Sequence, residues 1–203
     1  MNSIKYSLTF INKSYNQGSV CIYQTNRNLQ QDVLSLAWIT KRVNPSTSVT
    51  FQWSLDYGFF WCETGELQSG AIFRAYQVWL ADEEYNNSVT YKYIDDAFTF
   101  DNLTHRDNNG VFYIKQDHTI PHKTSSVGIS VAGSGAFVTQ AQPNLTLMFK
   151  LNPEYWITFG NYSQGEVLNL TEIYNKQKLN FSLNMHNICA TLNQDNLWTI
   201  SNI

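Results

Sequence analysis

The closest pair among the four histidines is His118 and His122, in the segment QDHTIPHKT. Histidines four residues apart can bind zinc together when both lie on one face of a helix. Pro121 lies between them and opposes a helix, and on an extended segment this spacing separates the two histidines by about 13 Å. The segment therefore predicts a surface connection and no metal site.

Carboxylates occur in three short clusters, at residues 63–66, 82–84 and 95–96. A glycosidase needs two carboxyl groups at a set separation across a cleft. A β-sandwich could place Asp56 or Glu63 opposite another carboxylate, but no spacing in the sequence indicates such a pair. We interpret the clusters as solvated turns and keep a carboxylate-pair hydrolase as a third hypothesis.

Motifs of nucleophilic catalysis and of nucleotide binding do not occur in the sequence. It contains no G-x-S-x-G elbow, and its one glycine-rich motif, AGSGA at 132–136, joins two apolar runs instead of opening a helix. The DNNG segment at 107–110 resembles the start of a calcium loop but lacks the further acidic residue that completes one. The sequence therefore predicts a protein that is not an enzyme, with no catalytic residue, no metal and no cofactor.

The best candidate for ligand binding lies in NPEYWITFGNYSQGEV, residues 152–167. If Tyr155 and every second residue after it face the core, Trp156 lies on the opposite face, beside a loop that holds Asn161 and Tyr162. An exposed aromatic ring with neighbouring amides is typical of a glycan-binding patch, because rings stack on sugar C–H groups and amides bond hydroxyls. The same composition is typical of a subunit interface, and a loop that buries Trp156 is the remaining alternative.

The surface must be covered mainly by neutral polar side chains. Only 14% of the 203 residues are charged, against about 25% in a typical domain. The net charge is −3 and no cluster of Lys and Arg occurs, which argues against nucleic acid and anionic membranes as partners. Because few charges keep copies of the chain apart, the composition favours a homo-oligomer or a larger assembly.

The start of the chain predicts its compartment. MNSIKYSLTFINKS alternates polar and apolar residues and lacks the continuous apolar core of a secretory signal. No window approaches the roughly 18 apolar residues of a membrane helix. We expect a soluble cytoplasmic protein, with leaderless export as the alternative. The three cysteines, Cys21, Cys62 and Cys189, form no CxxC pair, which favours buried thiols over a disulfide framework or a zinc site.

Alternation of polar and apolar residues with period two dominates the chain, as in Tyr6, Leu8 and Phe10. Small and polar segments between such runs predict hairpins at AGSG, NQDN and HRDNNG. Residues 28–41 and 73–85 fit either a short helix or a strand. We therefore expect an all-β protein, a two-sheet antiparallel β-sandwich or jelly roll with at most one or two short helices, in which residues 1–203 form a single domain.

The segment FQWSLDYGFFWCETG, residues 51–65, contains six aromatic side chains. Five of them fall on odd positions, which predicts a core-facing strand, and Phe60 is the exception. Gly58 could shift the register by one, because glycine within a strand often marks a bulge or bend. In that alternative Phe60 is buried with Cys62, and the pair of Phe59 and Trp61 faces outward.

Seven blocks of the sequence resemble a bacterial family typified by the rhizosphere-expressed protein RhiA of rhizobia. They are YSLTFIN, VCIYQT, SLAWITK, FQWSLDYGFFWCETGELQSGAIF, VGISVAGSGAFVTQAQPNL, YWITFGNYSQGEVL and ATLNQDNLWTI. The resemblance implies an abundant cytoplasmic protein of bacteria that interact with hosts, under population-density control and with no assigned enzymatic activity. It transfers no functional residue to this chain.

Two functions are consistent with these observations. The first is a non-enzymatic bacterial protein of RhiA-like type that associates with itself, in an ordered assembly or an intracellular inclusion. The alternative is a carbohydrate-binding β-sandwich module that uses Trp156, Asn161 and Tyr162.

Overall fold

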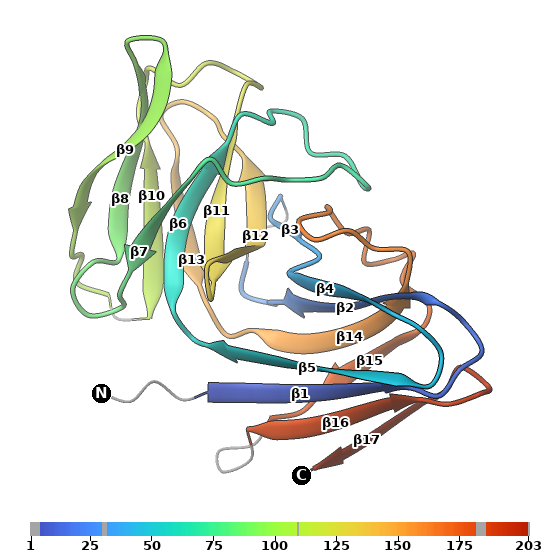
Figure 1. Ribbon diagram of the computed structural model, residues 1–203. Coiled ribbons are helices and arrows are strands. Elements are labelled where there is room, and N and C mark those ends of the chain that lie inside the picture. The colour runs from blue at the N-terminus through green and yellow to red at the C-terminus, as the bar shows by residue number, and fades with distance from the viewer. Residues whose placement is uncertain (1–4, 30–31, 109, 182–185, 203) are drawn as a thin grey trace.

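The computed structural model describes residues 5–29, 32–108, 110–181 and 186–202, which form seventeen strands and no helix (Figure 1). This confirms the all-β class. Three strands occur where the two segments of mixed periodicity are described: β3 (Leu34–Ser35), β4 (Ile39–Val43) and β7 (Gln77–Ala81). Each pairs with a neighbouring strand, so backbone pairing within a sheet outweighs the helical spacing of their apolar residues.

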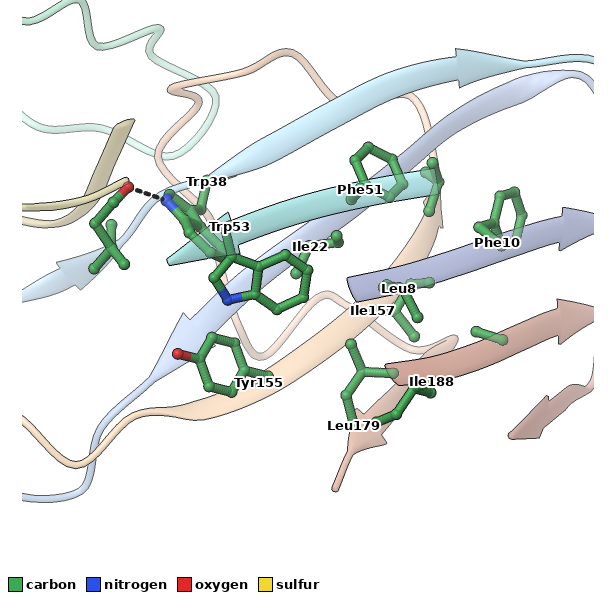
Figure 2. Packing of buried hydrophobic residues seen from close by; sticks show 14 of the residues in the cluster. Leu8, Phe10, Ile22, Trp38, Phe51, Trp53, Tyr155, Ile157, Leu179 and Ile188 are labelled. Carbon is green, nitrogen blue, oxygen red and sulfur yellow. Dashed lines mark hydrogen bonds between the residues drawn. The ribbon is translucent and has the colours of Figure 1, made fainter. Parts of the chain in front are cut away.

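Two four-stranded sheets face each other in one half of the molecule. In order across the first sheet, the strands are β17 (Trp198–Asn202), β16 (Asn187–Leu192), β1 (Lys5–Asn12) and β5 (Thr47–Ser54). In order across the second, they are β15 (Lys176–Leu179), β14 (Glu154–Gly160), β2 (Gly18–Thr25) and β4. One hydrophobic cluster fills the space between the two sheets, with side chains such as Leu8, Ile22 and Ile157 gathered from both (Figure 2).

The other half contains a five-stranded and a four-stranded sheet. The five-stranded sheet has the order β3, β12 (Ser134–Gln140), β11 (Ser126–Val131), β6 (Tyr57–Cys62) and β7. The four-stranded sheet has the order β13 (Thr146–Lys150), β10 (Val111–Gln116), β8 (Ser88–Ile94) and β9 (Ala97–Thr104). A second hydrophobic cluster joins their facing sides and contains Phe59, Phe112 and Ile129.

The predicted sandwich is therefore present, but four sheets in two facing pairs replace the two sheets that we expected. The chain passes from one pair to the other between β5 and β6, at Leu55 and Asp56, which belong to no strand. Phe51 and Trp53 before this break enter the first cluster, whereas Phe59 and Trp61 after it enter the second. The odd-numbered aromatics are thus core residues, as predicted, but of two different cores.

Neither alternative for the even-numbered Phe60 describes the structure, because β6 is covered on both faces. Phe59 and Trp61 pack toward the second cluster, and Phe60 packs with Cys62 and Phe73 in a third cluster on the other side of the sheet. All three aromatics are buried, so none faces outward. Parity assigns residues to two faces, but it identifies a solvated face only where the sheet has one.

Two of the three predicted hairpins are confirmed. The AGSG segment joins β11 to β12 and the NQDN segment joins β16 to β17, in each case between antiparallel neighbours. The third prediction is wrong: HRDNNG connects β9 to β10, which are not neighbours, since β8 lies between them and pairs with β10 in parallel. A turn-rich segment shows that the chain reverses, but it does not specify which strand becomes the partner.

A second parallel pair joins distant parts of the chain. Strand β1 pairs with β16 from Ser7 opposite Asn187 to Asn12 opposite Leu192. On its other edge β1 pairs antiparallel with β5. The first described strand therefore lies inside its sheet, hydrogen-bonded on both sides.

Candidate functional site

Strand β14 divides its side chains as the alternation predicts. Tyr155 and Ile157 belong to the cluster between the first two sheets, and Trp156 lies on the opposite face of its sheet. There Trp156 packs beside Leu170 and Tyr162 against a small buried cluster. Its indole N–H donates a hydrogen bond to the hydroxyl oxygen of Thr25 at 3.0 Å. The predicted opposite-face position of Trp156 is confirmed, and the chain that follows β14 covers part of the ring.

Trp156 borders a pocket of about 340 Å³ at the end of β2. Polar groups of Thr25, Asn26 and Arg27 line the pocket together with Trp156 and several apolar side chains. Neither Asn161 nor Tyr162 lines it. The three residues that the sequence grouped therefore do not line this pocket together.

Charged groups surround the ring of Trp156. The ammonium groups of Lys176 and Lys178 lie 5.9 and 6.0 Å from its centroid, close enough for cation–π attraction. Lys178 also donates a hydrogen bond to Glu154 at 2.7 Å. This hydrogen bond, with the charge of Arg27 at 3.6 Å, holds the pKa of the Glu154 carboxyl below its usual range. Trp156 thus has charged neighbours in addition to the apolar contacts of Leu170 and Tyr162.

Asn161 and Tyr162 follow the end of β14 and differ in exposure. Asn161 is exposed, whereas Tyr162 is half-buried beside Gly160, where an added Cβ would lie 3.1 Å from the Tyr162 ring. Burial raises the pKa of Tyr162 above its ordinary value. Tyr162 is therefore partly a packing residue, and Asn161 is the member of this group whose side chain faces solvent.

An open groove of about 1030 Å³ lies where the two halves of the molecule meet, between the end of β5 and the turn after β7. Carboxylates border it, because Asp56 and the acidic run at residues 82–84 both lie on its rim. The Asp82 carboxylate accepts hydrogen bonds from the backbone N–H groups of Glu84 and Tyr85 at 2.8 and 3.0 Å, which holds the turn. The acidic run therefore forms a turn, as the sequence predicts, and the Asp82 carboxylate is hydrogen-bonded within it.

Tyr57 also lines this groove. Burial, reinforced by the negative charge of Glu83, raises the pKa of Tyr57 to about 12. Tyr57 therefore keeps its proton at neutral pH and acts there as a packing residue with a polar tip. Its ring packs against Phe112 with the centroids 5.1 Å apart.

The segment from Ile72 to Tyr85, which we call the β7 surface, contains a concentration of exposed apolar side chains. Large hydrophobic residues are exposed at ten described positions, and five of these are in the β7 surface: Ile72, Tyr76, Val78, Leu80 and Tyr85. Val78 and Leu80 alternate along β7 and so share one face of the sheet. Leu80 is 75% exposed because the residue opposite it on β6 is Gly58, which has no side chain to cover it.

The apolar residues of the β7 surface are visible in the sequence, but the mixed periodicity of residues 73–85 does not show that they are exposed. Residues 73–85 fitted a helix as well as a strand, so their apolar residues could be assigned to a core-facing stripe. Only the pairing of β7 with β6 reveals that Val78 and Leu80 point away from both cores.

Within the described part of the chain, no group of three or more His, Cys, Asp and Glu side chains could hold a metal ion. His118 lies beside Asp117, with 3.8 Å between Nδ1 and Oδ2, in the exposed connection after β10. The three cysteines are unpaired, with Cys21 and Cys62 buried and Cys189 half-buried. Across the described ranges, no helix is long and apolar enough to cross a membrane.

Comparisons with known proteins agree over nearly the full length. A family model described as RhiA matches residues 3–203. Protein RhiA of Rhizobium leguminosarum bv. viciae is 30% identical over 200 residues, which cover 97% of this chain and 86% of that protein. No solved structure matches the chain.

Proposed function

Since the chain belongs to the RhiA family, as its sequence blocks indicate, we propose that it is a non-enzymatic protein whose copies associate with one another into an ordered homo-oligomeric assembly. The observation that carries the proposal is the β7 surface, where half of the exposed large hydrophobic side chains of the described residues occur within fourteen positions. Exposed large apolar side chains concentrated in one segment of a folded protein commonly mark an interaction surface. The low charge of the chain supports the same conclusion, because little repulsion opposes contact between identical copies.

Light scattering coupled to size-exclusion chromatography tests the proposal, with the purified protein loaded from low micromolar to millimolar concentration. We expect a mass that is a multiple of 23.4 kDa and that rises with concentration. Association through apolar surface should persist at 0.5 M salt, because salt screens charges and leaves hydrophobic burial in place. A constant mass of one chain across the whole range contradicts the proposal.

The finer form that we propose is an inclusion in the bacterial cytoplasm. Electron tomography of cells that express the protein at its natural level tests this form separately. Ordered bodies that carry an antibody label against the chain support it. Uniform labelling throughout the cytoplasm, together with association in vitro, restricts the proposal to small oligomers.

Carbohydrate binding is the second candidate, and the pocket beside Trp156 favours it. Sugar sites combine an aromatic ring with several hydrogen-bonding side chains in one concave region, and this pocket has Trp156, Thr25 and Asn26. A glycan array with the wild type, Trp156→Ala and Asn161→Ala tests the candidate. We expect loss of binding with Trp156→Ala and retention with Asn161→Ala, because Asn161 does not line the pocket. The absence of any bound glycan, or binding that Trp156→Ala leaves unchanged, eliminates this function.

A further inference from the structure

We infer that two copies of the chain join through β7, which pairs antiparallel with β7 of the second copy about a two-fold axis at Trp79. This inference rests on the proposed self-association and specifies the surface that produces it. Three features of the structure support it: an unpaired strand edge, the lack of protection on that edge, and the symmetry of its sequence.

Strand β7 forms one edge of the five-stranded sheet. It pairs with β6 on one side, and on its other side no described strand pairs with it. An edge strand presents a row of free backbone N–H and C=O groups, which is a template for another strand. The backbone of β7 is therefore available for pairing along residues 77–81.

Soluble proteins usually protect such edges with charged side chains, bulges or very short strands. The described sheets follow this rule at five of their edges. Lysine or arginine is present on β4, β13 and β15, β9 carries an aspartate and a register shift, and β3 has two residues. The edges β5 and β17 have no charged residue, but their exposed side chains are polar. Strand β7 has no charged residue and no register shift, and its exposed side chains are apolar.

The sequence of β7 is complementary to itself. Trp79 is the middle residue of the five, so an antiparallel pair centred on it places Val78 of each copy opposite Leu80 of the other. Identical patches that face each other in this way form the isologous interface of a two-fold dimer. Val78 and Leu80 are 38% and 75% exposed in the single chain, and the pairing would bury both against apolar partners.

Sedimentation equilibrium of the full chain tests the inference with Leu80→Lys as the main variant. A lysine at this position introduces a charge into the centre of the pairing face, and we expect the dimer dissociation constant to rise at least about tenfold. Leu197→Lys is the matched control, because Leu197 is also largely exposed (63%) but lies in the β16–β17 turn. We expect its dissociation constant to stay within about twofold of the wild type.

A pair of opposite charges tests the register. Leu80→Glu should weaken the dimer at least about tenfold, and Leu80→Glu combined with Val78→Lys should restore part of the affinity at low salt, because the register at Trp79 places position 78 of each copy opposite position 80 of the other. Circular dichroism and melting temperature verify that each variant folds, and Leu80→Ser replaces Leu80→Lys if the lysine variant does not. A double variant that associates as weakly as Leu80→Glu overturns the register at Trp79.

The outcomes separate this inference from the proposed function. If the wild type associates and Leu80→Lys associates equally well, the self-association stands and the β7 interface is wrong. If the wild type is a single chain at every concentration, both are wrong. If Leu80→Lys dissociates and Leu197→Lys does not, both are supported.

Discussion

The indole N–H of Trp38 donates a hydrogen bond to the carbonyl oxygen of Val131 at 2.9 Å. Trp38 is fully buried between β3 and β4, and its ring meets the ring of Trp53 edge to face at 5.4 Å. Val131 ends β11, in the five-stranded sheet of the other half of the molecule. The Trp38 side chain therefore joins a strand of the five-stranded sheet to the first hydrophobic cluster, to which Val131 also belongs.

Trp38→Phe should lower the free energy of unfolding by about 2 to 4 kcal/mol. The variant leaves the buried carbonyl of Val131 without its donor and leaves a cavity where the indole was. Urea denaturation followed by circular dichroism measures the change. Trp198→Phe is the control, because the indole of Trp198 donates to Asn175 at an exposed position, and its loss should cost less than about 1 kcal/mol. Equal losses for the two variants would contradict the proposed role of Trp38.

Gly128→Ala should destabilise the protein by at least about 2 kcal/mol, because the backbone of β12 occupies the space that a side chain would need. An added Cβ would lie 2.0 Å from the carbonyl oxygen of Phe137 and 2.7 Å from the ring of Phe60. Gly133→Ala provides the comparison. Gly133 has a φ of +75° and no atom within 4 Å of an added Cβ. Gly133→Ala should therefore lower the free energy of unfolding by only about 1 kcal/mol, from backbone strain. Thermal and urea unfolding rank the two variants, and the opposite order would refute the steric argument.

Stability should fall as the pH rises from 8 to 10.5. Burial raises the pKa of Tyr57 to about 12 and raises the pKa values of Cys21, Tyr91 and Tyr155 further. In the unfolded chain these groups ionise near pH 8.5 and pH 10. Between the unfolded and folded pKa values the unfolded state binds fewer protons, so alkali favours unfolding. Below pH 8 both states are protonated and these groups contribute no slope.

We expect urea denaturation to show a loss of at least about 2 kcal/mol over this interval. Tyr91→Phe should give a shallower slope above pH 9.5, because one raised pKa is removed. An unfolding free energy that is the same at pH 8 and pH 10.5 would contradict the prediction.

Thiol labelling at pH 8 should distinguish the cysteines. Cys189 is half-buried on β16 and should react quickly with a disulfide reagent. Cys21 and Cys62 are buried, and burial raises the pKa of the Cys21 thiol, so both should react only as the protein unfolds. Cys189→Ser should remove the fast phase. A fast phase of two or three thiols per chain would contradict the burial of this pair.

Local features of this fold could be predicted from the sequence. The two four-residue hairpins at AGSG and NQDN are confirmed because each joins strands that are neighbours in both sequence and space. The alternation that placed Trp156 opposite Tyr155 also holds, since the side-chain period of a strand is set by its backbone.

The pairing of distant strands could not be predicted in the same way. The alternation of β8 does not indicate that β10 lies beside it in parallel. It also does not indicate that HRDNNG connects β9 to a strand on the far side of β8. Phe60 shows the second limit, because a strand buried on both faces has no polar face to define its orientation. The exposure of Val78 and Leu80 could not be predicted either. It depends on the pairing of β7 with β6, and on the position of Gly58 opposite Leu80 in that pair.

The parallel pairing of β1 with β16 determines the order in which the protein can be completed during synthesis. Ser7 and its partner Asn187 lie about 180 positions apart, a span that a ribosome translates in roughly 10 to 40 s. During that time β1 can pair with β5, but its other edge remains open. The sheet that contains β1 therefore closes only after β16 has been synthesised, and until then one edge of β1 is open to other partners.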